Sequence, residues 1–221
     1  GVLGRPPRAA FYPPAARVRQ YRGAAAINWA IIDGEKRTGV TTFLLDNDID
    51  TGLIIDSAET PISDDDNVET VHDRLMDIGA DLVVRTVERI AEGQPLGTPQ
   101  AELMPGTPLR HAPKIFKDDC RIDWHQGVRG VHNFVRGLSP YPGSWTTLAP
   151  SGAVLKVYGA AKTGEATQEA PGTISVSGHR LLVATADEWL ELKEVQMAGK
   201  KRMPANAFLN GNRAIEESVC Q

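Results

Sequence analysis

The stretch YRGAAAINWAIIDGEKRTGVTTFLLDNDIDTGLII, from Tyr21 to Ile55, decides the fold of the first half of the chain. Its Ala-rich beginning, residues 24–32, ends at an Asp-Gly pair, and such an ending is typical of a helix. Residues 39–45 are β-branched and aromatic, a composition that predicts a strand. A polar turn follows at residues 46–52, and residues 53–62 predict a second strand. This order of helix, strand, turn and strand indicates an α/β domain.

A long amphipathic helix is predicted directly after this stretch. Residues 64–67 (DDDN) offer an N-cap and first-turn acids, which suit the positive end of a helix dipole. Apolar residues then recur at helical spacing, and they are Val68, Val71, Leu75, Ile78, Leu82 and Ile90. Residues 93–113 contain five prolines and little apolar periodicity, so we expect a semi-rigid linker there.

The second half of the chain is predicted to be β-rich. Residues 128–138 predict a helix, and the Ser-Pro-Tyr-Pro-Gly sequence that follows ends it. Candidate strands, separated by Gly, Pro and Ser turns, lie at residues 145–148, 153–160, 172–176, 180–185 and 189–195. Short strands at this spacing indicate a small barrel or sandwich. Residues 205–211 are expected to form one closing turn of helix.

The composition is that of an ordinary globular protein, with 41% hydrophobic and 24% charged residues. No window approaches the roughly 18 consecutive apolar residues that a membrane span needs, and no apolar segment of a secretory signal follows the N-terminal arginines. Cys120 and Cys220 belong to no Cys/His cluster, which predicts reduced thiols in a cytoplasmic protein. The five histidines form no metal-binding pattern, so we expect no metal.

The net charge of −4 is unevenly distributed along the chain. Residues 1–22 carry five Arg and no acid, residues 23–112 carry six basic against seventeen acidic residues, and residues 113–221 carry thirteen against eleven. A polyanion would therefore be repelled by the middle of the chain and tolerated by its C-terminal part. The Arg, Pro and Ala content of residues 1–20 indicates a disordered leader there rather than a buried strand.

Two polar segments are candidate functional sites. Residues 46–52 (DNDIDTG) place several carboxylates on a turn between two apolar strands, where a rigid scaffold can present side chains to a cleft. Taken alone, a solvated hairpin tip is the simpler interpretation. Residues 199–203 (GKKRM) form a compact basic cluster after a predicted strand, and by itself such a cluster is usually a charged loop.

Five blocks follow one another in a specific order. The first, at residues 21–55, has an Arg-Gly-Ala helix start, a Gly-Val-Thr strand and an Asp-Thr-Gly turn. The others are HAPKIFKDDCRIDW (111–124), RGLSPYPGSW (136–145), APGTI (170–174) and GKKRM with AFLNG (199–211). The first block resembles the folate-dependent formyltransferase domain, and the others resemble the C-terminal domain of methionyl-tRNA formyltransferases.

The resemblance implies an α/β fold with the second half of a Rossmann-like formyltransferase domain at residues 21–92. A linker at 93–113 and a C-terminal tRNA-binding barrel at 114–221, of the oligonucleotide-binding (OB) type, would follow. The implied reaction moves a formyl group from 10-formyltetrahydrofolate to the amino group of methionine on initiator tRNA, without a metal. The family's Asp-Thr-Gly aspartate falls on Asp50, the expected catalytic residue.

The resemblance also implies two sets of binding residues. Those expected at the folate and substrate site are Arg22, Gly23, Asp46, Asp48 and Gly52. Those expected to contact tRNA are Lys114, Lys117, Arg121, Lys200, Lys201 and Arg202.

The sequence departs from the family pattern just before Tyr21. The family has Asn-Leu-His there, whose Asn and His stabilise the oxyanion of the tetrahedral intermediate, followed by a Ser-Leu-Leu-Pro loop that contacts folate. Counted back without gaps, the Asn position falls on Tyr12, the His position on Pro14 and the loop on residues 16–19. Proline offers no side-chain donor and exchanges no proton, so we expect no formyl transfer by this chain alone. Residues 1–20 are then a leader from outside the family, left by a truncation, a frameshift or a degenerate copy.

Two alternatives stay open. The hydrolase domain of a 10-formyltetrahydrofolate dehydrogenase has a very similar Arg-Gly-Ala block, although no carrier or dehydrogenase domain follows residues 199–203. The absence of Asn-x-His favours a non-catalytic tRNA-binding remnant, while the intact turn at Asp50 favours recent descent from an active enzyme. Sugar-nucleotide formyltransferases fit less well. In the leading interpretation the partner is initiator methionyl-tRNA, and the protein is a cytoplasmic monomer that binds no membrane.

Overall fold

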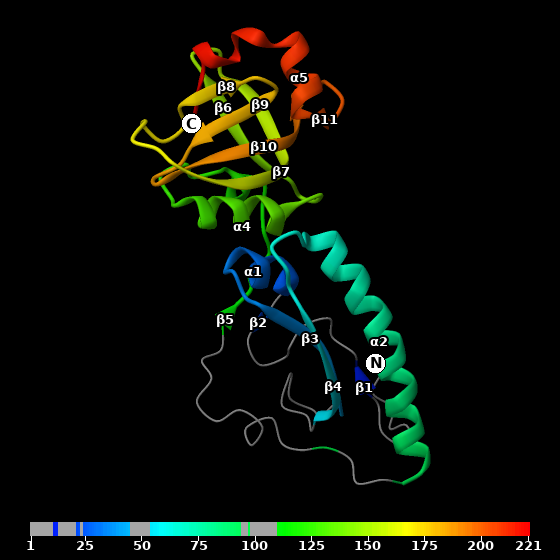
Figure 1. Cartoon of the computed structure of the whole chain (residues 1–221). Helices are drawn as coiled ribbons and strands as arrows, with labels where there is room; N and C mark the ends of the chain where they lie inside the picture. Colours follow the sequence, from blue (N-terminus) through cyan, green and yellow to red (C-terminus); the bar gives the residue numbers. More distant parts are fainter. Residues whose placement is uncertain (1–10, 13–20, 23, 45–53, 94–96, 98–109) are drawn as a thin grey trace. The chain divides into compact units, whose positions relative to one another are not determined.

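The computed structural model forms two compact units (Figure 1). It describes residues 11–12, 21–22, 24–44, 54–93, 97 and 110–221. The first unit takes in Gly1–Ala30, Glu35–Asp65 and Thr70–Lys114. The second takes in Ile31–Gly34, Asp66–Glu69 and Ile115–Gln221. Most of the linker predicted at residues 93–113 falls outside the described residues.

An antiparallel hairpin forms the sheet of the first unit. β3 (Arg37–Leu44) pairs with β4 (Ile54–Pro61), and both strands confirm the prediction from β-branched composition. β1 (Phe11–Tyr12) pairs with the other edge of β3. The sequence predicted no strand within residues 1–20, and this pairing corrects that expectation because two aromatic residues suit a strand despite the neighbouring prolines.

Both helices predicted for the first half of the chain are present. α1 (Ala26–Ile32) is followed by Gly34, whose φ of 75° is a left-handed conformation that favours glycine at a helix end. α2 runs over Val68–Ala91 and buries three of the six predicted apolar residues, Val71, Leu75 and Leu82, together with Thr86, which was not predicted. In the described part of the chain, no helix is both long and apolar enough to cross a membrane.

Polar contacts join α2 to the hairpin. The hydroxyl groups of Thr42 on β3 and Thr86 on α2 lie 2.8 Å apart and are buried. Thr86 also hydrogen-bonds the carbonyl oxygen of Leu82 at 2.8 Å. Arg89 donates from Nη1 to the carbonyl oxygen of Ile55 at 2.7 Å. The buried hydroxyls are therefore paired with each other rather than left without partners.

A short parallel pair brings together two blocks that are far apart in sequence. β2 (Tyr21–Arg22) pairs with β5 (Arg110–His111). Tyr21 is buried, and its hydroxyl oxygen accepts a hydrogen bond from Nη1 of Arg110 at 2.9 Å. The same Nη1 lies 3.1 Å from Oε1 of Glu35. The first and second sequence blocks thus meet within the first unit.

The second unit is built on a curled antiparallel sheet, which confirms the prediction of a β-rich second half. The strands run in the order β12-β6-β7-β10-β9-β8, and β11 pairs with β10. An isolated antiparallel bridge between Thr173, just before β8, and Val219 of β12 links the two ends of this path. The strands are β6 (Ser144–Ala149), β7 (Ala153–Ala166), β8 (Ile174–Ser177), β9 (Arg180–Ala184), β10 (Glu188–Met197), β11 (Met203–Pro204) and β12 (Val219–Cys220).

Two helices cover this sheet and enclose its core. α4 (Val128–Leu138) lies against β7 and α5 (Ala205–Gly211) against β10, and both confirm the predicted helices. Two short 3₁₀ helices, Asp118–Cys120 and Arg213–Glu217, were not predicted. The core includes Trp124, whose indole Nε1 donates to Oγ1 of Thr146 at 3.0 Å. Its apolar members include Val131, Val135, Val157, Leu181 and Leu190.

A distant carboxylate fixes the start of α4. The backbone N–H of Val128 donates to Oδ1 of Asp187 at 2.7 Å, and Thr185 donates to the same oxygen at 3.0 Å. A carboxylate at a helix N-terminus satisfies an otherwise unpaired N–H and interacts favourably with the helix dipole. The turn between β9 and β10 therefore caps a helix that begins 59 residues earlier in the chain.

Candidate nucleic-acid interface

The predicted catalytic and folate-binding residues lie almost entirely outside the described part of the chain. Asp50 belongs to the connection between β3 and β4 that is not described. Asp46, Asp48 and Gly52 belong to the same connection, and Gly23, between β2 and α1, is also outside the described residues. Arg22 is placed by its backbone, in β2 opposite His111 of β5. The predicted site that can be built from side chains is therefore the tRNA-binding one.

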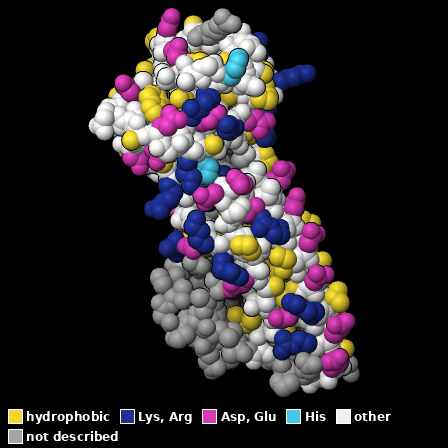
Figure 2. All heavy atoms as spheres, viewed as in Figure 1, with side chains coloured by type: hydrophobic (Ala, Val, Ile, Leu, Met, Phe, Trp, Pro, Cys, Tyr) yellow, Lys and Arg dark blue, Asp and Glu magenta, His cyan; other side chains and the backbone are white. Residues whose placement is uncertain are grey.

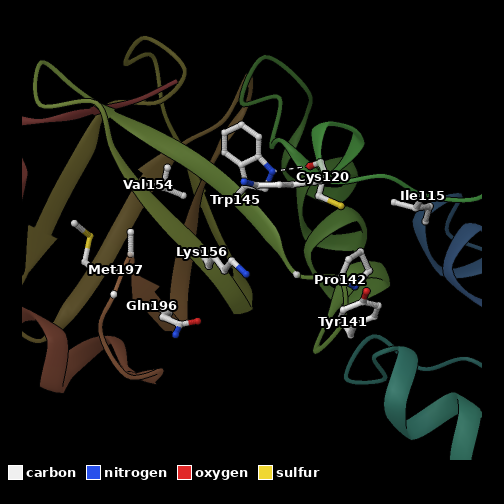
Figure 3. Close-up of a pocket in the computed structure, with 13 residues that line it drawn as sticks. Ile115, Cys120, Tyr141, Pro142, Trp145, Val154, Lys156, Gln196 and Met197 are labelled. Atoms are coloured by element: carbon white, nitrogen blue, oxygen red, sulfur yellow. Dashed lines mark hydrogen bonds between the residues drawn. The ribbon is translucent and has the colours of Figure 1, made fainter.

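A cavity of about 550 Å³ opens in the second unit (Figure 3). Its wall combines aromatic, basic and amide side chains, namely Tyr141, Trp145, Lys117, Lys156 and Gln196. In Figure 3 the ammonium group of Lys156 points toward the side of the cavity where Tyr141 and Pro142 lie. The described residues that line the cavity include no Asp or Glu. This cavity is therefore suited to a neutral or anionic ligand rather than a cation.

Trp145 is fixed in position at one wall of the cavity. Its indole Nε1 donates to the carbonyl oxygen of Lys117 at 2.8 Å. The guanidinium carbon of Arg121 lies 5.8 Å from the centre of a Trp145 ring, within cation–π range. Lys156 is the residue directly opposite Trp145 in the pairing of β6 with β7. The register of these two strands thus places an aromatic and a basic residue as direct neighbours on the same face of the sheet.

A network of hydrogen bonds holds another part of the wall. The hydroxyl of Tyr158 donates to Oε1 of Gln196 at 2.9 Å, and Nε2 of Gln196 donates to the carbonyl oxygen of Lys200 at 2.8 Å. Arg202 lies over the Tyr158 ring at 4.3 Å and donates to Oε2 of Glu194 at 2.6 Å. That hydrogen bond raises the pKa of Arg202. The basic segment is thereby anchored to β7 and β10.

Cys120 lines the same cavity but is a poor nucleophile. Its thiol is buried and donates to the carbonyl oxygen of Phe116 at 3.2 Å. Burial and the charge of Asp119 raise the pKa of this thiol, and the charge of Lys156 lowers it by less. Since the thiolate is the reactive form, Cys120 contributes apolar surface at neutral pH rather than covalent chemistry.

Four lysines supply positive charge in and next to the cavity. Lys117 and Lys156 line it, and Lys200 and Lys201 directly follow Gly199, another lining residue. Within residues 110–221, none of these four ammonium groups forms an ion pair with a carboxylate. Unpaired ammonium groups are available to phosphate oxygens.

Comparison with known proteins decides the family. A formyl transferase model matches residues 18–87, and a model of the formyl transferase C-terminal domain matches residues 114–213. The methionyl-tRNA formyltransferase of Bacteroides fragilis is 45% identical over 219 residues, which cover 97% of this chain and 68% of that protein. The enzyme of Parabacteroides distasonis is 47% identical over 221 residues, covering 98% and 68%. The chain belongs to the methionyl-tRNA formyltransferase family.

Solved structures of other proteins share the fold at low sequence identity. HypX from Aquifex aeolicus, solved in complex with tetrahydrofolic acid, superposes with a TM-score of 0.66 at 18% identity, over 90% of this chain and 34% of HypX. The sugar formyltransferase WlaRD, solved with dTDP and 5-N-formyl-THF, gives 0.64 at 17% identity, over 86% and 66%. The fold of this chain is therefore shared with HypX and with a sugar formyltransferase.

The structure brings together only some of the predicted tRNA contacts. Lys117 lines the cavity, and the backbone of Lys200 is tied to its wall through Gln196. Arg121 lies over Trp145 and lines a different cavity of about 490 Å³. Lys201 is exposed.

Of the other two predicted contacts, Arg202 is engaged by Glu194 and Tyr158, and Lys114 belongs to the first unit. Of the six predicted residues, Lys117 therefore lines the cavity, and Lys200 is hydrogen-bonded to a lining residue, Gln196.

Sequence reasoning missed part of the cavity wall. Tyr141, Trp145, Lys156 and Gln196 were not predicted as site residues. One signal was available, because Lys156 stands between the buried residues of an alternating strand and must face the other side of the sheet. The position of Trp145 beside it, on the neighbouring strand β6, depends on the strand register, which the sequence pattern did not specify.

Proposed function

We propose that the chain is part of an enzyme that formylates methionyl-tRNA and that it supplies an RNA-binding surface of that enzyme. The observation that supports this most strongly is the 45% identity to the Bacteroides fragilis enzyme across 97% of the chain. Unpaired lysines beside an aromatic cavity add chemical support, since RNA presents phosphates and bases. Initiator methionyl-tRNA is the proposed partner and 10-formyltetrahydrofolate the proposed formyl donor, without a metal.

The proposed reaction needs a group that moves protons and donors for a developing oxyanion. The amino group of methionine attacks the formyl carbon, the tetrahedral intermediate releases tetrahydrofolate, and the proton of the amine leaves. Asp50 is the residue proposed to assist that proton movement. Arg22, Gly23, Asp46, Asp48 and Gly52 are proposed to shape the donor and substrate site.

The chain of residues 1–221 is proposed to bind tRNA without transferring a formyl group. Tyr12 and Pro14 stand where gap-free counting places the family's Asn and His. Proline has no side-chain donor for the oxyanion and no group that exchanges a proton. The oxyanion stabilisation on which the family depends would therefore be missing.

The RNA contacts are proposed to go to phosphate oxygens. Lys117, Lys200 and Lys201 have ammonium groups without carboxylate partners within residues 110–221, so they are expected to contribute most. Arg202 is expected to contribute less because it already binds Glu194. Lys114 and Arg121 complete the proposed set. Such contacts position RNA and give little sequence selectivity.

The second unit is proposed to be a barrel of the OB type, in which one face of the sheet binds oligonucleotides. The continuous strand path and the bridge between Thr173 and Val219 at its ends support this proposal. We also propose the division into residues 21–92, 93–113 and 114–221. The protein is proposed to act as a cytoplasmic monomer, and light scattering on the purified chain tests the monomer.

Two assays on the purified chain test the proposed function. In the first, methionyl-initiator tRNA and 10-formyltetrahydrofolate are expected to give no formylmethionyl-tRNA above background, because each lost oxyanion donor typically costs about 10²–10³ in rate. In the second, the same tRNA is expected to bind at low salt, with little preference over an elongator tRNA. Robust turnover would contradict the proposed inactivity, and absence of tRNA binding would contradict the RNA-binding role.

A further inference from the structure

The cavity beside Trp145 has features that phosphate contacts do not explain. Tyr141, which lines it, is 82% exposed. Phe116 is 62% exposed and stands in sequence between Ile115 and Lys117, both of which line the cavity. A large exposed aromatic side chain at the wall of a cavity is typical of a binding surface. A phosphate alone would leave this aromatic surface unused.

The arrangement around Trp145 offers flat apolar surface and positive charge at one place. Arg121 lies over the Trp145 ring but lines the other cavity and not this one. On the cavity side, Lys156 stands directly opposite Trp145 in the sheet. Lys117 holds the indole through its backbone oxygen and is itself a lining residue of the cavity.

The wall is also pre-formed. Both polar ends of the Gln196 side chain are occupied, one by Tyr158 and one by the carbonyl oxygen of Lys200. Trp145 is held by its indole hydrogen bond. Side chains that are already ordered lose less conformational entropy when a ligand binds. A volume of about 550 Å³ also falls in the range of about 300–1,000 Å³ that is usual for small-molecule sites.

We propose that this cavity binds one unpaired nucleotide, with its base against Tyr141 and Trp145 and its phosphate near Lys156 and Lys117. The absence of acidic residues among the described lining residues disfavours cationic ligands, and the aromatic surface distinguishes a nucleotide from a bare phosphate. The nucleotide comes from an unpaired segment of RNA or from a free mononucleotide, which present the same chemistry. The RNA source rests on the proposed function, whereas the cavity chemistry does not.

Fluorescence anisotropy on the full chain tests the inference. The probe is a labelled single-stranded hexaribonucleotide, and AMP and inorganic phosphate are competitors. Tyr141→Leu is expected to weaken hexamer binding about tenfold, because stacking on an aromatic ring is lost. Lys156→Ala is expected to weaken binding and to reduce the salt dependence by the share of one phosphate contact. Lys162→Ala is the matched control, because Lys162 is an exposed lysine about 20 Å further along β7.

The outcomes separate the cavity from the proposed function. If AMP but not phosphate displaces the hexamer, the cavity binds a nucleotide and a free mononucleotide is its ligand. If AMP does not displace the hexamer but Tyr141→Leu and Lys156→Ala weaken its binding, the ligand is a segment of RNA. Hexamer binding without tRNA binding would refute the proposed function and leave the cavity standing. Absence of hexamer binding, equal affinity of all variants with unchanged circular dichroism, or displacement by phosphate as strong as by AMP would overturn the inference.

Discussion

The two units bury their apolar residues in different ways. In the second unit the strands form a curled sheet, an isolated bridge between Thr173 and Val219 links its two ends, and one apolar cluster lies inside it. In the first unit the described sheet has three strands, β1, β3 and β4, with α2 packed on the hairpin. α2 leaves Met76, Val84 and Val87 exposed, and Figure 2 shows hydrophobic and acidic side chains together along it.

This difference indicates which part carries its own stability. A sheet whose ends are linked leaves little unpaired edge and surrounds a core with side chains from every strand. A hairpin with one helix buries less apolar surface for each ordered residue, and that surface must offset the conformational entropy of ordering the chain. The second unit should therefore be the independent folding unit of the two.

Cutting the chain is expected to have the largest effect. A fragment of residues 113–221 should unfold cooperatively on heating, whereas a fragment of residues 21–92 should show no cooperative transition. Circular dichroism measures the transitions, and amide hydrogen exchange locates the protected strands. In the intact chain, limited proteolysis should cut within residues 93–113 and leave the C-terminal piece. Native-like exchange protection of residues 39–44 in the isolated N-terminal fragment would show that the first unit also folds independently.

Substitution of a single glycine tests the contact between the two ends of the second sheet. Gly172 has a φ of 91°, and a Cβ placed there would run into the carbonyl oxygen of Cys220 on β12. Gly172→Ala is therefore expected to lower the free energy of unfolding by about 3 kcal/mol. Gly178 also has a positive φ, of 64°, but faces open space, so Gly178→Ala should cost only about 1 kcal/mol. Urea unfolding measures both, and equal losses would show that contact with β12 is unimportant.

The thiol of Cys220 provides a smaller test of the same edge. Burial raises the pKa of Cys220 from an ordinary 9.0 to about 12, although a hydrogen bond with Thr146 lowers it somewhat. The unfolded chain therefore loses this proton above about pH 9, while the folded chain keeps it until about pH 12. The contribution of the buried thiol to the free energy of unfolding is therefore fully present below pH 9. It is lost as the pH rises toward 12, at about 1.4 kcal/mol per pH unit.

Comparison with Cys220→Ala isolates this contribution. The free energy of unfolding of the original protein should fall more steeply between pH 9 and pH 11 than that of the variant, since other groups titrate equally in both. Parallel pH profiles would mean that the thiol is ionisable in the folded state and that β12 opens readily.

Sequence reasoning predicted what is local and missed what is distant. Composition and the Gly, Pro and Ser turns between segments were enough to predict β3, β4 and the strands from β6 to β10, because both are local properties of the sequence. The cap of α4 by Asp187 and the parallel pairing of Tyr21 with Arg110 join residues far apart in sequence. No pattern within a window of neighbouring residues encodes such contacts.

The candidate site divides in the same way. The basic run at residues 200–202 was visible in the sequence, but the engagement of Arg202 by Glu194 and Tyr158 was not. The facing pair of Trp145 and Lys156 depends on the register between β6 and β7. The role of Asp50 rests on family resemblance and stays a prediction, because its position is outside the described residues.

A salt titration tests whether the second unit binds tRNA through phosphate contacts, as we propose. The affinity of the full chain for initiator tRNA is measured between low and moderate salt for the original protein, Lys200→Ala and Lys201→Ala, with Lys162→Ala as control. We expect the affinity to fall steeply with salt and the slope of log K against log salt to become shallower by about 1 for each of the two variants, but not for the control. Binding that ignores both the salt concentration and the Lys200 and Lys201 substitutions would contradict the account.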